Sequence, residues 1–272
     1  MNTEFDPKNY RSDLKPVWCP GCGDYSVIAA IARALANLKI RQENVAFISG
    51  IGCSSRIAAY ASTYGFHGIH GRALPLASGV KVARPDLTVL AAGGDGDGFS
   101  IGGNHFLHAC RRNVDMTYIV MDNSVYGMTK GQASPTSEAD WCGSKLTPEG
   151  PSIPPIQPLE VALAAQASYV SRAFTGDLAE LTRQIEEAIS HKGFSLVHVL
   201  SPCVTYRPEQ RGYKDRVHQE WTPTSNRAEA FQRLLEDDGF ATGTLFVDPR
   251  PPYTPMTAAP ASMAEIEADF AI

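Results

Sequence analysis

The sequence predicts an α/β fold in which a mostly parallel sheet is flanked by helices on both faces. Short apolar runs without polar alternation, typical of strands buried on both faces, alternate with longer runs of helical period. Polar or glycine-rich segments directly follow several of these apolar runs. Because such sheets bind ligands at the carboxyl ends of their strands, the same segments are candidates for a functional site.

Length and composition describe one large domain with appendages. The chain has 272 residues, a formal net charge of −5 and 43% hydrophobic residues. It is long enough to fold without disulfides or a structural metal. An acidic balance without a basic cluster argues against a nucleic-acid partner. No apolar run reaches the roughly 18 residues of a membrane span, and the N-terminus lacks a signal-peptide core, so we expect a cytoplasmic protein with no membrane partner.

The first part of the chain predicts an arm, two helices and two strands. Residues 1–18 are rich in charge and proline, and we expect an extended arm. Asp24–Leu38 has helical period with Asp24 as its N-cap, and Leu74–Ala83 has helical period up to an Arg-Pro pair. Val45–Ser49 and Thr88–Ala92 are apolar runs followed by glycine, which is typical of buried strands.

The middle of the chain continues this alternation and then breaks it. Ile101–Arg112 predicts a helix and Met116–Met121 predicts a strand. Residues 123–157 contain five prolines and predict a long loop. A loop of that length inside a domain usually has a function. Leu159–Gln166 predicts the next helix.

The last part of the chain changes in character after about residue 205. Before that point, Tyr169–Phe174 and Phe194–Leu200 predict strands around the amphipathic helix Asp177–His191. After it, the chain is polar and rich in proline, with one helix near Arg227–Leu235 and a short strand at Thr244–Val247. We therefore predict a main domain over residues 1–205 and an irregular C-terminal extension over residues 206–272 that contacts partner subunits.

A glycine-rich segment with two aspartates, residues 93–98, follows one predicted strand. Glycines let backbone N–H groups approach phosphates closely, and the helix that follows offers its N-terminus to an anion. A carboxylate in such a loop suits a divalent cation that bridges phosphates. The spacing fits neither a P-loop nor a dinucleotide fingerprint. A plain glycine-rich turn with exposed aspartates is the alternative.

Asn123 follows the next predicted strand. The carboxyl ends of neighbouring parallel strands lie side by side, so Asn123 could meet Asp95 of the glycine-rich segment. A carboxylate, an amide oxygen and a backbone carbonyl would make an octahedral Mg²⁺ site together with diphosphate oxygens. A role for Asn123 as a helix cap or turn residue is the alternative.

Four of the six cysteines occur in segments that end at this same edge of the sheet. Cys19 and Cys22 form a C-x-x-C pair, and Cys53 and Cys203 each follow a predicted strand. Four soft thiolates near glycines suit an iron–sulfur cluster. A thioredoxin-like redox pair, a structural zinc site and simple buried thiols are the alternatives.

The two remaining cysteines and two histidines lack the partners that a metal site would need. Cys110 lies on an apolar helix face and is expected in the core, and Cys142 has no partner spacing. His105 and His108 have no third metal ligand in reach, so we expect packing histidines on a buried helix.

Six segments occur in the order and with the spacing of a known family. They are C-P-G-C-G, S-G-I-G-C-S-S-R, H-G-R-A-L-P-L-A-S-G-V-K, G-D-G-D-G-F-S-I-G-G-N-H, D-N-S-V-Y-G-M-T-K-G-Q-A-S-P-T and S-P-C. Together they resemble the β subunit of 2-oxoacid:ferredoxin oxidoreductases over roughly residues 12–205. The S-P-C-V-T-Y continuation is most similar to the 2-oxoglutarate branch.

The resemblance implies a thiamine-diphosphate-binding fold that carries one [4Fe–4S] cluster. It implies Mg²⁺ on Asp95, Asn123 and the carbonyl of Val125. It implies four cluster ligands: Cys19, Cys22, Cys53 and Cys203. It also implies a cofactor pocket formed by these residues: Gly52, Cys53, His70, Gly94, Asp95, Gly96, Asp97, Asn123, Val125, Tyr126 and Gly127.

The implied reaction is the oxidative decarboxylation of 2-oxoglutarate to succinyl-CoA and CO₂, or the reverse carboxylation. Electrons would pass through the cluster to ferredoxin, with coenzyme A as co-substrate. The partner would be an α subunit, which supplies the glutamate that activates thiamine. Alternatives are a pyruvate or broad 2-oxoacid enzyme, a non-oxidative thiamine decarboxylase, and an electron-transfer module in which the glycine-rich segment is a mere turn.

Four further residues are candidates for roles in catalysis or substrate binding. His70 and Arg72 could line the pocket, with His70 moving a proton or stabilising an oxyanion, or the two could only order their loop. Arg56 could bind the second carboxylate of 2-oxoglutarate, or form a surface or interface salt bridge. Met128 could shape the same pocket.

Overall fold

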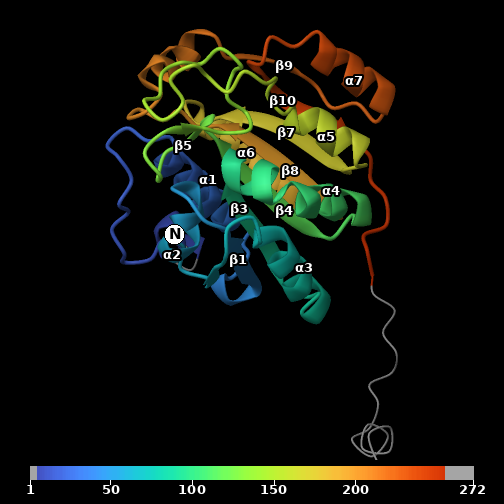
Figure 1. Cartoon of the computed structure of the whole chain (residues 1–272). Coiled ribbons are helices and arrows are strands. Elements are labelled where there is room, and N and C mark those ends of the chain that lie inside the picture. Colours follow the sequence, from blue (N-terminus) through green and yellow to red (C-terminus); the bar gives the residue numbers. More distant parts are fainter. Residues whose placement is uncertain (1–4, 255–272) are drawn as a thin grey trace, which may run out of the picture.

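The structure is a computed structural model that describes residues 5–254. Within that range, eight strands form one sheet in the order β2-β1-β3-β4-β8-β7-β10-β9 (Figure 1). The strand bounds are β1 Val45–Ser49, β2 Tyr64–His67, β3 Thr88–Gly94, β4 Met116–Asp122, β7 Tyr169–Phe174, β8 Phe194–Leu200, β9 His218–Trp221 and β10 Ala241–Val247. Neighbouring strands are parallel except for β10 and β7, which are antiparallel. The predicted mostly parallel sheet is confirmed.

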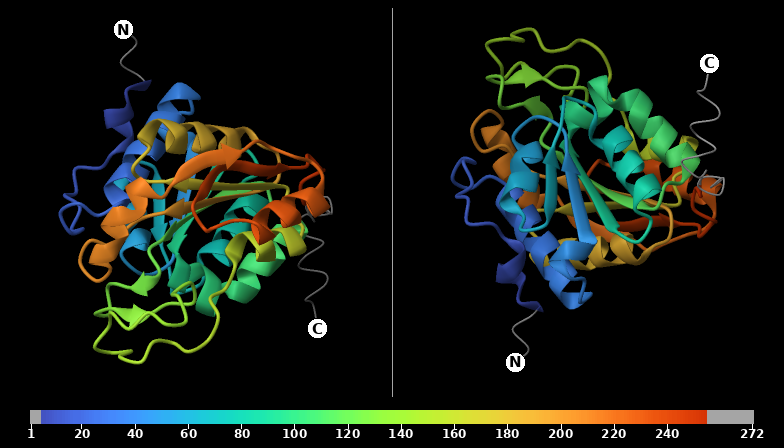
Figure 2. Two further views of the ribbon diagram at one scale, coloured as in Figure 1. Left: turned by 90° about the horizontal axis from the view of Figure 1, so that it is seen from above. Right: turned by 90° about the horizontal axis from the view of Figure 1, so that it is seen from below.

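Helices cover both faces of this sheet (Figure 2). The α-helices are α1 Asp24–Asn37, α2 Ile57–Tyr60, α3 Ala73–Ala83, α4 Gly103–Arg112, α5 Pro158–Ala164, α6 Leu178–Ser190 and α7 Arg227–Leu235. Tighter or wider helical turns are η2 Pro7–Tyr10, η3 Gln42–Asn44, η4 Ser54–Arg56, the π-helical η5 Gly96–Ile101 and η6 Pro208–Asp215. None of the helices between residues 5 and 254 combines the length and apolarity needed to cross a bilayer.

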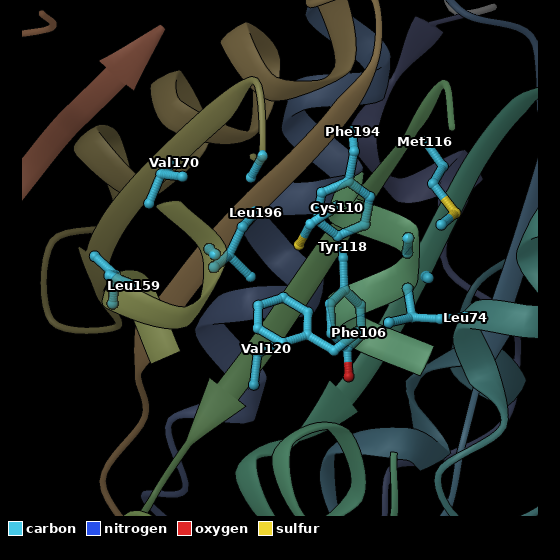
Figure 3. Packing of buried hydrophobic residues seen from close by; sticks show 14 of the residues in the cluster. Leu74, Phe106, Cys110, Met116, Tyr118, Val120, Leu159, Val170, Phe194 and Leu196 are labelled. Atoms are coloured by element: carbon cyan, nitrogen blue, oxygen red, sulfur yellow. The ribbon is translucent and has the colours of Figure 1, made fainter. Parts of the chain in front are cut away.

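The central strands build the core because their side chains point alternately to the two faces. In β4, Tyr118 and Val120 pack against α3, α4 and α5, whereas Ile119 and Met121 pack against α1 and α6. Every residue of β4 is buried, which explains why its sequence before Asp122 is apolar except for Thr117, whose hydroxyl donates to the carbonyl of Ala188. Figure 3 shows the first of these layers, where Phe106, Tyr118 and Phe194 meet. Cys110 lies in the same layer with no exposed surface, as predicted.

The two edge strands and the small elements were not predicted. In β2 all four residues are exposed, so the segment lacks the apolar run by which the central strands were found. β9 has one buried residue of four. The long loop also contains a short hairpin formed by β5 Val125–Tyr126 and β6 Gln132–Ala133.

The segment after residue 205 is more regular than the predicted irregular extension. Its predicted helix is α7, and its predicted strand lies within β10, which pairs directly with β7 of the main sheet. A buried ion pair of 2.5 Å between Arg172 of β7 and Asp237 ties the segment to the sheet. Residues 206–247 therefore complete the domain instead of leaving it. Residues 255–272 of the predicted extension and 1–4 of the predicted arm lie outside the described residues.

The histidines of α4 correct one expectation. His105 and His108 are half-buried on the outer side of the helix, not packed in the core. Arg111 donates a hydrogen bond to the Nδ1 of His108 at 3.4 Å. The helix is amphipathic, and its buried side is formed by Phe106, Ala109 and Cys110.

Candidate cofactor pocket and cysteine site

Four parallel strands bring the candidate residues to one edge of the sheet. The chain leaves β1 at the segment that holds Cys53, β3 at Asp95, β4 at Asn123 and β8 at Cys203. β1, β3, β4 and β8 are consecutive neighbours in the sheet. Their carboxyl ends therefore lie in a row, as the sequence predicted for the glycine-rich and cysteine-containing segments.

A cavity of about 310 Å³ opens at this edge. All eleven residues of the predicted cofactor pocket line it, from Gly52 after β1 to Gly127 in the loop after β4. Three further lining residues, Ile51, Ser54 and Thr129, were not predicted, and the remaining one, Met128, was predicted to shape the substrate pocket. The structure thus brings the predicted pocket residues together, and their binding of a cofactor stays a prediction.

Asp95 is the buried carboxylate at the centre of this cavity, with 2% of its surface exposed. The hydroxyl of Thr136 lies 3.0 Å from Asp95 Oδ2 and 2.8 Å from Asp122 Oδ1, so it bridges two carboxylates. Burial and the nearby charge of Asp122 raise the pKa of Asp95 to about 7. A divalent cation would relieve both effects, because it compensates the desolvated charge and the repulsion between the carboxylates. The site therefore fits a Mg²⁺ ion.

His198 contacts Asp122, the second of these two carboxylates. Its Nε2 lies 2.9 Å from Asp122 Oδ2, and both side chains are buried. Burial opposes ionisation of Asp122, but the hydrogen bond and charge of His198 hold the pKa of that carboxyl below its usual value. Asp122 is thus kept as the charged partner, and Asp95 is the carboxylate that needs a cation.

Asp97, the second aspartate of the glycine-rich segment, holds loops together. Its Oδ1 accepts hydrogen bonds from the backbone N–H of Ile51 at 2.9 Å and of Gly71 at 2.7 Å, and lies 3.0 Å from His70 Nδ1. Burial raises the pKa of this carboxyl in spite of these partners. Because Nδ1 of His70 is engaged, Nε2 is the ring nitrogen left for a bound molecule.

The backbone of the glycine-rich segment starts a helix directly. Asp95 caps the π-helical turn η5, which continues into α4 after Gly102. A Cβ on Gly96 would lie 2.1 Å from the ring of Tyr126, so only glycine lets that ring close over the turn. Backbone N–H groups at the start of this helical segment suit the phosphate oxygens of a diphosphate.

The four cysteines line a second cavity of about 100 Å³ that adjoins the first. Cys19 is exposed, and the other three are half-buried. Cys53, Asn123, Gly127 and Met128 line both cavities. A Cβ on Gly127 would lie 3.7 Å from the Sγ of Cys53 and 3.9 Å from that of Cys203, so this backbone runs directly beside two of the sulfurs.

The cysteine site fits a multi-iron cluster better than a redox pair or a single zinc ion. Burial raises the pKa of Cys22 well above its usual value and that of Cys53 to about 11, with Asp24 and the neighbouring thiols adding to the shift. A redox pair of the thioredoxin type needs the opposite, a lowered thiol pKa. Among the described residues no three His, Cys, Asp or Glu side chains surround a point closely enough for one ion, as tetrahedral zinc requires. Four thiols spread around a cavity suit a larger, positively charged iron–sulfur core.

Trp18 binds the C-x-x-C segment to the loop of Cys53. Its Nε1 donates to the backbone carbonyl of Cys53 at 2.7 Å. Its ring stands edge-on to Tyr25 and Tyr60, with centroids 5.2 and 4.9 Å away. Tyr60 also accepts a hydrogen bond from the backbone N–H of Val17 at 3.1 Å. Sequence reasoning read Trp18 only as part of a cysteine motif.

The candidate residues Arg56, Met128 and Arg72 fall in three different places. Arg56 lines the cysteine cavity, where its Nε donates to the hydroxyl of Tyr60 at 3.1 Å. Met128 lines both cavities. Arg72 lies outside both, and its guanidinium donates to the carbonyls of Gly71 and Ile101. The structure therefore brings His70, but not Arg72, to the predicted pocket.

Comparison with known proteins agrees with this geometry. The sequence profile of the C-terminal thiamine pyrophosphate-binding domain of thiamine pyrophosphate enzymes matches residues 50–199. These residues begin directly after β1, hold β2 to β7, nearly all of β8 and every residue that lines the first cavity, and end just before Cys203.

Curated relatives share much of the sequence. The chain is 49% identical over 196 residues to the 2-oxoglutarate oxidoreductase subunit KorB of Mycobacterium tuberculosis, a match that covers 72% of this chain and 52% of that protein. It is 40% identical over 232 residues to subunit beta of 2-oxoacid:ferredoxin oxidoreductase 2 of Aeropyrum pernix, covering 83% of this chain and 75% of that one. The match thus spans about half the length of the mycobacterial relative.

A solved structure matches the whole chain. It is that of the 2-oxoglutarate:ferredoxin oxidoreductase from Magnetococcus marinus with 2-oxoglutarate, coenzyme A and succinyl-CoA bound. The TM-score is 0.92 at 38% sequence identity, and the match covers 100% of this chain and 98% of that chain.

Proposed function

Because this chain belongs to the β subunits of the 2-oxoacid:ferredoxin oxidoreductases, we propose that it is the thiamine-binding and electron-transferring half of a 2-oxoglutarate:ferredoxin oxidoreductase. The observation that carries the proposal is the contact between the two cavities, which share Cys53, Asn123, Gly127 and Met128. A pocket for a metal–diphosphate cofactor thus adjoins four cysteines suited to a one-electron carrier.

The proposed reaction oxidises 2-oxoglutarate with coenzyme A to succinyl-CoA, CO₂ and one proton. The two electrons released leave through the cluster to ferredoxin, and the reverse carboxylation uses the same parts. The bound ligands named for the Magnetococcus enzyme and the name of the mycobacterial relative support 2-oxoglutarate as substrate over pyruvate or a broad range of 2-oxoacids. When bound, thiamine diphosphate supplies the carbon nucleophile and the electron sink, and the cluster accepts single electrons.

In this proposal the residues of the first cavity hold and orient the cofactor. Asp95, the side chain of Asn123 and the carbonyl of Val125 would hold Mg²⁺, and the backbone N–H groups of the glycines and of the start of η5 would bind the diphosphate. His70, fixed through Nδ1 by Asp97, presents Nε2 to the reacting oxygen and holds or gives a proton there.

The pocket needs a partner chain to be complete. Among residues 5–254, the carboxylates that line the first cavity are Asp95 and Asp97. Asp95 is proposed as a metal ligand, and Asp97 is bound to backbone N–H groups. Neither is free to activate thiamine, so an α subunit supplies that glutamate, as the resemblance implies. We expect the chain alone to be inactive.

Substrate recognition is proposed for the wall between the cavities. 2-Oxoglutarate carries a second carboxylate, whose burial requires a cation or several strong donors. Met128 lines both cavities and Arg56 lines the cysteine cavity, and a guanidinium binds a carboxylate in a bidentate manner. Arg56 is therefore proposed to bind the distal carboxylate, with Met128 as apolar lining.

Purification of this chain together with its α subunit under anaerobic conditions tests the proposal. We expect four irons, four sulfides and one thiamine diphosphate for each β chain, and reduction of ferredoxin that depends on 2-oxoglutarate and coenzyme A. Activity with pyruvate alone would move the substrate assignment to the broader class. A complex that releases CO₂ without reducing ferredoxin and contains no iron would contradict the oxidative reaction itself.

A further inference from the structure

The chain after β8 lines the cysteine cavity with residues 203–206 and then places a buried amide against the backbone of Cys203 and Asn123. Gln210 lies in η6, and only 1% of its surface is exposed. Sequence reasoning placed it in the C-terminal extension and gave it no role. No charge or motif marks it, because its partners are backbone groups of distant segments.

The side chain of Gln210 bridges the two proposed sites. Its Oε1 accepts a hydrogen bond from the backbone N–H of Cys203 at 2.8 Å. Its Nε2 donates to the backbone carbonyl of Asn123, also at 2.8 Å. A backbone N–H can only donate and a carbonyl can only accept, so the orientation of the amide is fixed by its partners.

A second residue of the same turn reinforces the bridge. The guanidinium of Arg207, which is 2% exposed, donates to the carbonyl of Ser124 at 2.9 Å. It also pairs with Glu138 at 2.6 Å, and its backbone N–H donates to the carbonyl of Cys203 at 3.0 Å. The loop of Cys203 is therefore tied at two adjacent points to the segment that follows β4.

We propose that Gln210 is a positioning residue that fixes the cysteine site relative to the cofactor pocket and so sets the path of the electron between them. The proposal rests on the proposed function above. Cys203 is a predicted cluster ligand and Asn123 a predicted Mg²⁺ ligand, and one amide holds the main chains of both. Support of this kind keeps reacting groups in place to within a fraction of an ångström.

The bridge is strong because both of its partners are buried backbone groups. Removing the amide leaves an N–H and a carbonyl without partners in a site from which water is largely excluded. The segment then moves until these groups find other partners. Such a shift leaves the four thiols present but changes their spacing from the pocket.

The test uses the complete αβ enzyme with Gln210→Met, which keeps the length of the side chain but removes both hydrogen bonds. The matched control is Gln219→Met on the exposed face of β9. Cluster absorbance is followed in rapid mixing, once with 2-oxoglutarate and coenzyme A and once with dithionite. Iron content and the midpoint of thermal unfolding are measured on the same samples.

We expect Gln210→Met to retain its iron and to be reduced by dithionite at the wild-type rate. Reduction of the cluster by substrate should slow by roughly ten-fold or more, the scale of a lost buried hydrogen bond. The control should match the wild type in every measurement. Substrate-driven reduction at the wild-type rate overturns the proposal, and so does a parallel loss of iron, dithionite-reducible cluster and thermal stability, which marks a merely structural residue.

Gln210→Glu separates the two halves of the bridge if the Met variant does not fold. A carboxylate still accepts from the N–H of Cys203, but it places an oxygen against the carbonyl of Asn123. We expect this variant to keep its iron and to lose affinity for thiamine diphosphate with Mg²⁺, and unchanged affinity overturns the proposal. If the wild-type cluster itself is not reduced by 2-oxoglutarate, the proposed function fails, and that result is distinct from either outcome for Gln210.

Discussion

The two adjoining cavities are built in different ways. The cofactor pocket is lined by residues 51–54, 70, 94–97, 123 and 125–129, most of which closely follow neighbouring strands of the sheet. The cysteine site gathers residues from the N-terminal segment, from the loop after β1 and from the segment after β8. The sheet itself therefore fixes the first cavity, whereas the second depends in addition on a few side-chain hydrogen bonds to backbone groups.

This difference predicts how each site should respond to substitutions. Changes in the cofactor pocket should remove a ligand without moving the strands that carry it. Changes at the cysteine site should either remove a ligand or release a segment. If the two sites are as separate as their construction indicates, each should be removable without the other.

The largest expected effect is loss of the cluster alone. Cys203→Ala removes one of the four predicted cluster ligands, so iron should be lost or degraded and ferredoxin reduction abolished. Cys22→Ala and Cys53→Ala should behave alike. Binding of thiamine diphosphate with Mg²⁺ should persist in the Cys203 variant. Iron analysis measures loss of the cluster, and calorimetric titration with thiamine diphosphate and Mg²⁺ measures cofactor binding.

The control for this prediction is Cys142→Ala, because Cys142 is exposed and lies outside both cavities. Its iron content should equal that of the wild type. A full four-iron cluster in the Cys203 variant would show that the ligand set is wrong.

The converse change should remove the cofactor alone. Asp95→Ala deletes the buried carboxylate proposed to hold Mg²⁺, so the diphosphate loses its bridging cation. Affinity for thiamine diphosphate should become undetectable in calorimetry, and activity should vanish. Iron content should stay at the wild-type level. Unchanged cofactor affinity would refute the Mg²⁺ assignment.

An intermediate effect is expected at Arg56, which lines the cysteine cavity. Arg56→Ala should lower kcat/KM for 2-oxoglutarate. The loss should correspond to an activation free energy raised by about 2–3 kcal/mol, the scale of a lost charged hydrogen bond. Pyruvate lacks the distal carboxylate and should lose much less. Steady-state kinetics with both substrates give the comparison.

The hydrogen bond of Arg56 to Tyr60 gives a second possible role for Arg56, which the same experiment tests. Its Nε donates to Tyr60, which also receives the N–H of Val17 from the segment before Cys19. Equal losses with both substrates would therefore mean that Arg56 supports the cysteine site and does not bind the substrate. Tyr60→Phe, which removes that hydrogen bond but keeps the ring, tells the two roles apart.

The smallest expected effect is at Trp18. Trp18→Phe keeps an aromatic ring between Tyr25 and Tyr60 but removes the N–H that binds the carbonyl of Cys53. The cluster should form, but a chelator should bleach it several-fold to roughly ten-fold faster, as expected for about 1 kcal/mol of lost support. Cofactor affinity should not change. A bleaching rate equal to the wild type would show that the indole only packs.

Sequence patterns predicted the parts of the fold that are buried on both faces. β1, β3, β4, β7 and β8 are mostly apolar runs without regular polar alternation, and α1 and α6 have the period of helices with one buried side. β2 escaped because all four of its residues are exposed, so no apolar run marks it. Its place in the sheet comes from backbone pairing with β1, which side-chain patterns do not record.

In the candidate site, too, residues marked by a local sequence pattern were predicted, whereas residues that act through contacts distant in sequence were missed. The aspartate, asparagine and cysteines that follow strands were predictable, because parallel strands end at one edge of the sheet and these side chains are common metal ligands. Thr136 and Gln210 were missed because each acts on residues far away in sequence through a single hydroxyl or amide. The S-P-T triplet that contains Thr136 was noticed only as part of a family motif. Arg72 was expected at the pocket because it follows His70 closely, but a turn directs its side chain to the start of α4.

The distribution of the cysteines along the chain also has a consequence for synthesis. Three of the four predicted cluster ligands have been made once residue 53 leaves the ribosome, but Cys203 and the amide of Gln210 come about 150 residues later. At roughly 5–20 residues per second, that interval lasts about 10–30 s. Throughout it the early thiols have no fourth ligand and no β8 beside them. If these four cysteines hold a cluster, it can be completed only once Cys203 has been made, and the cell must keep the three early thiols reduced until then.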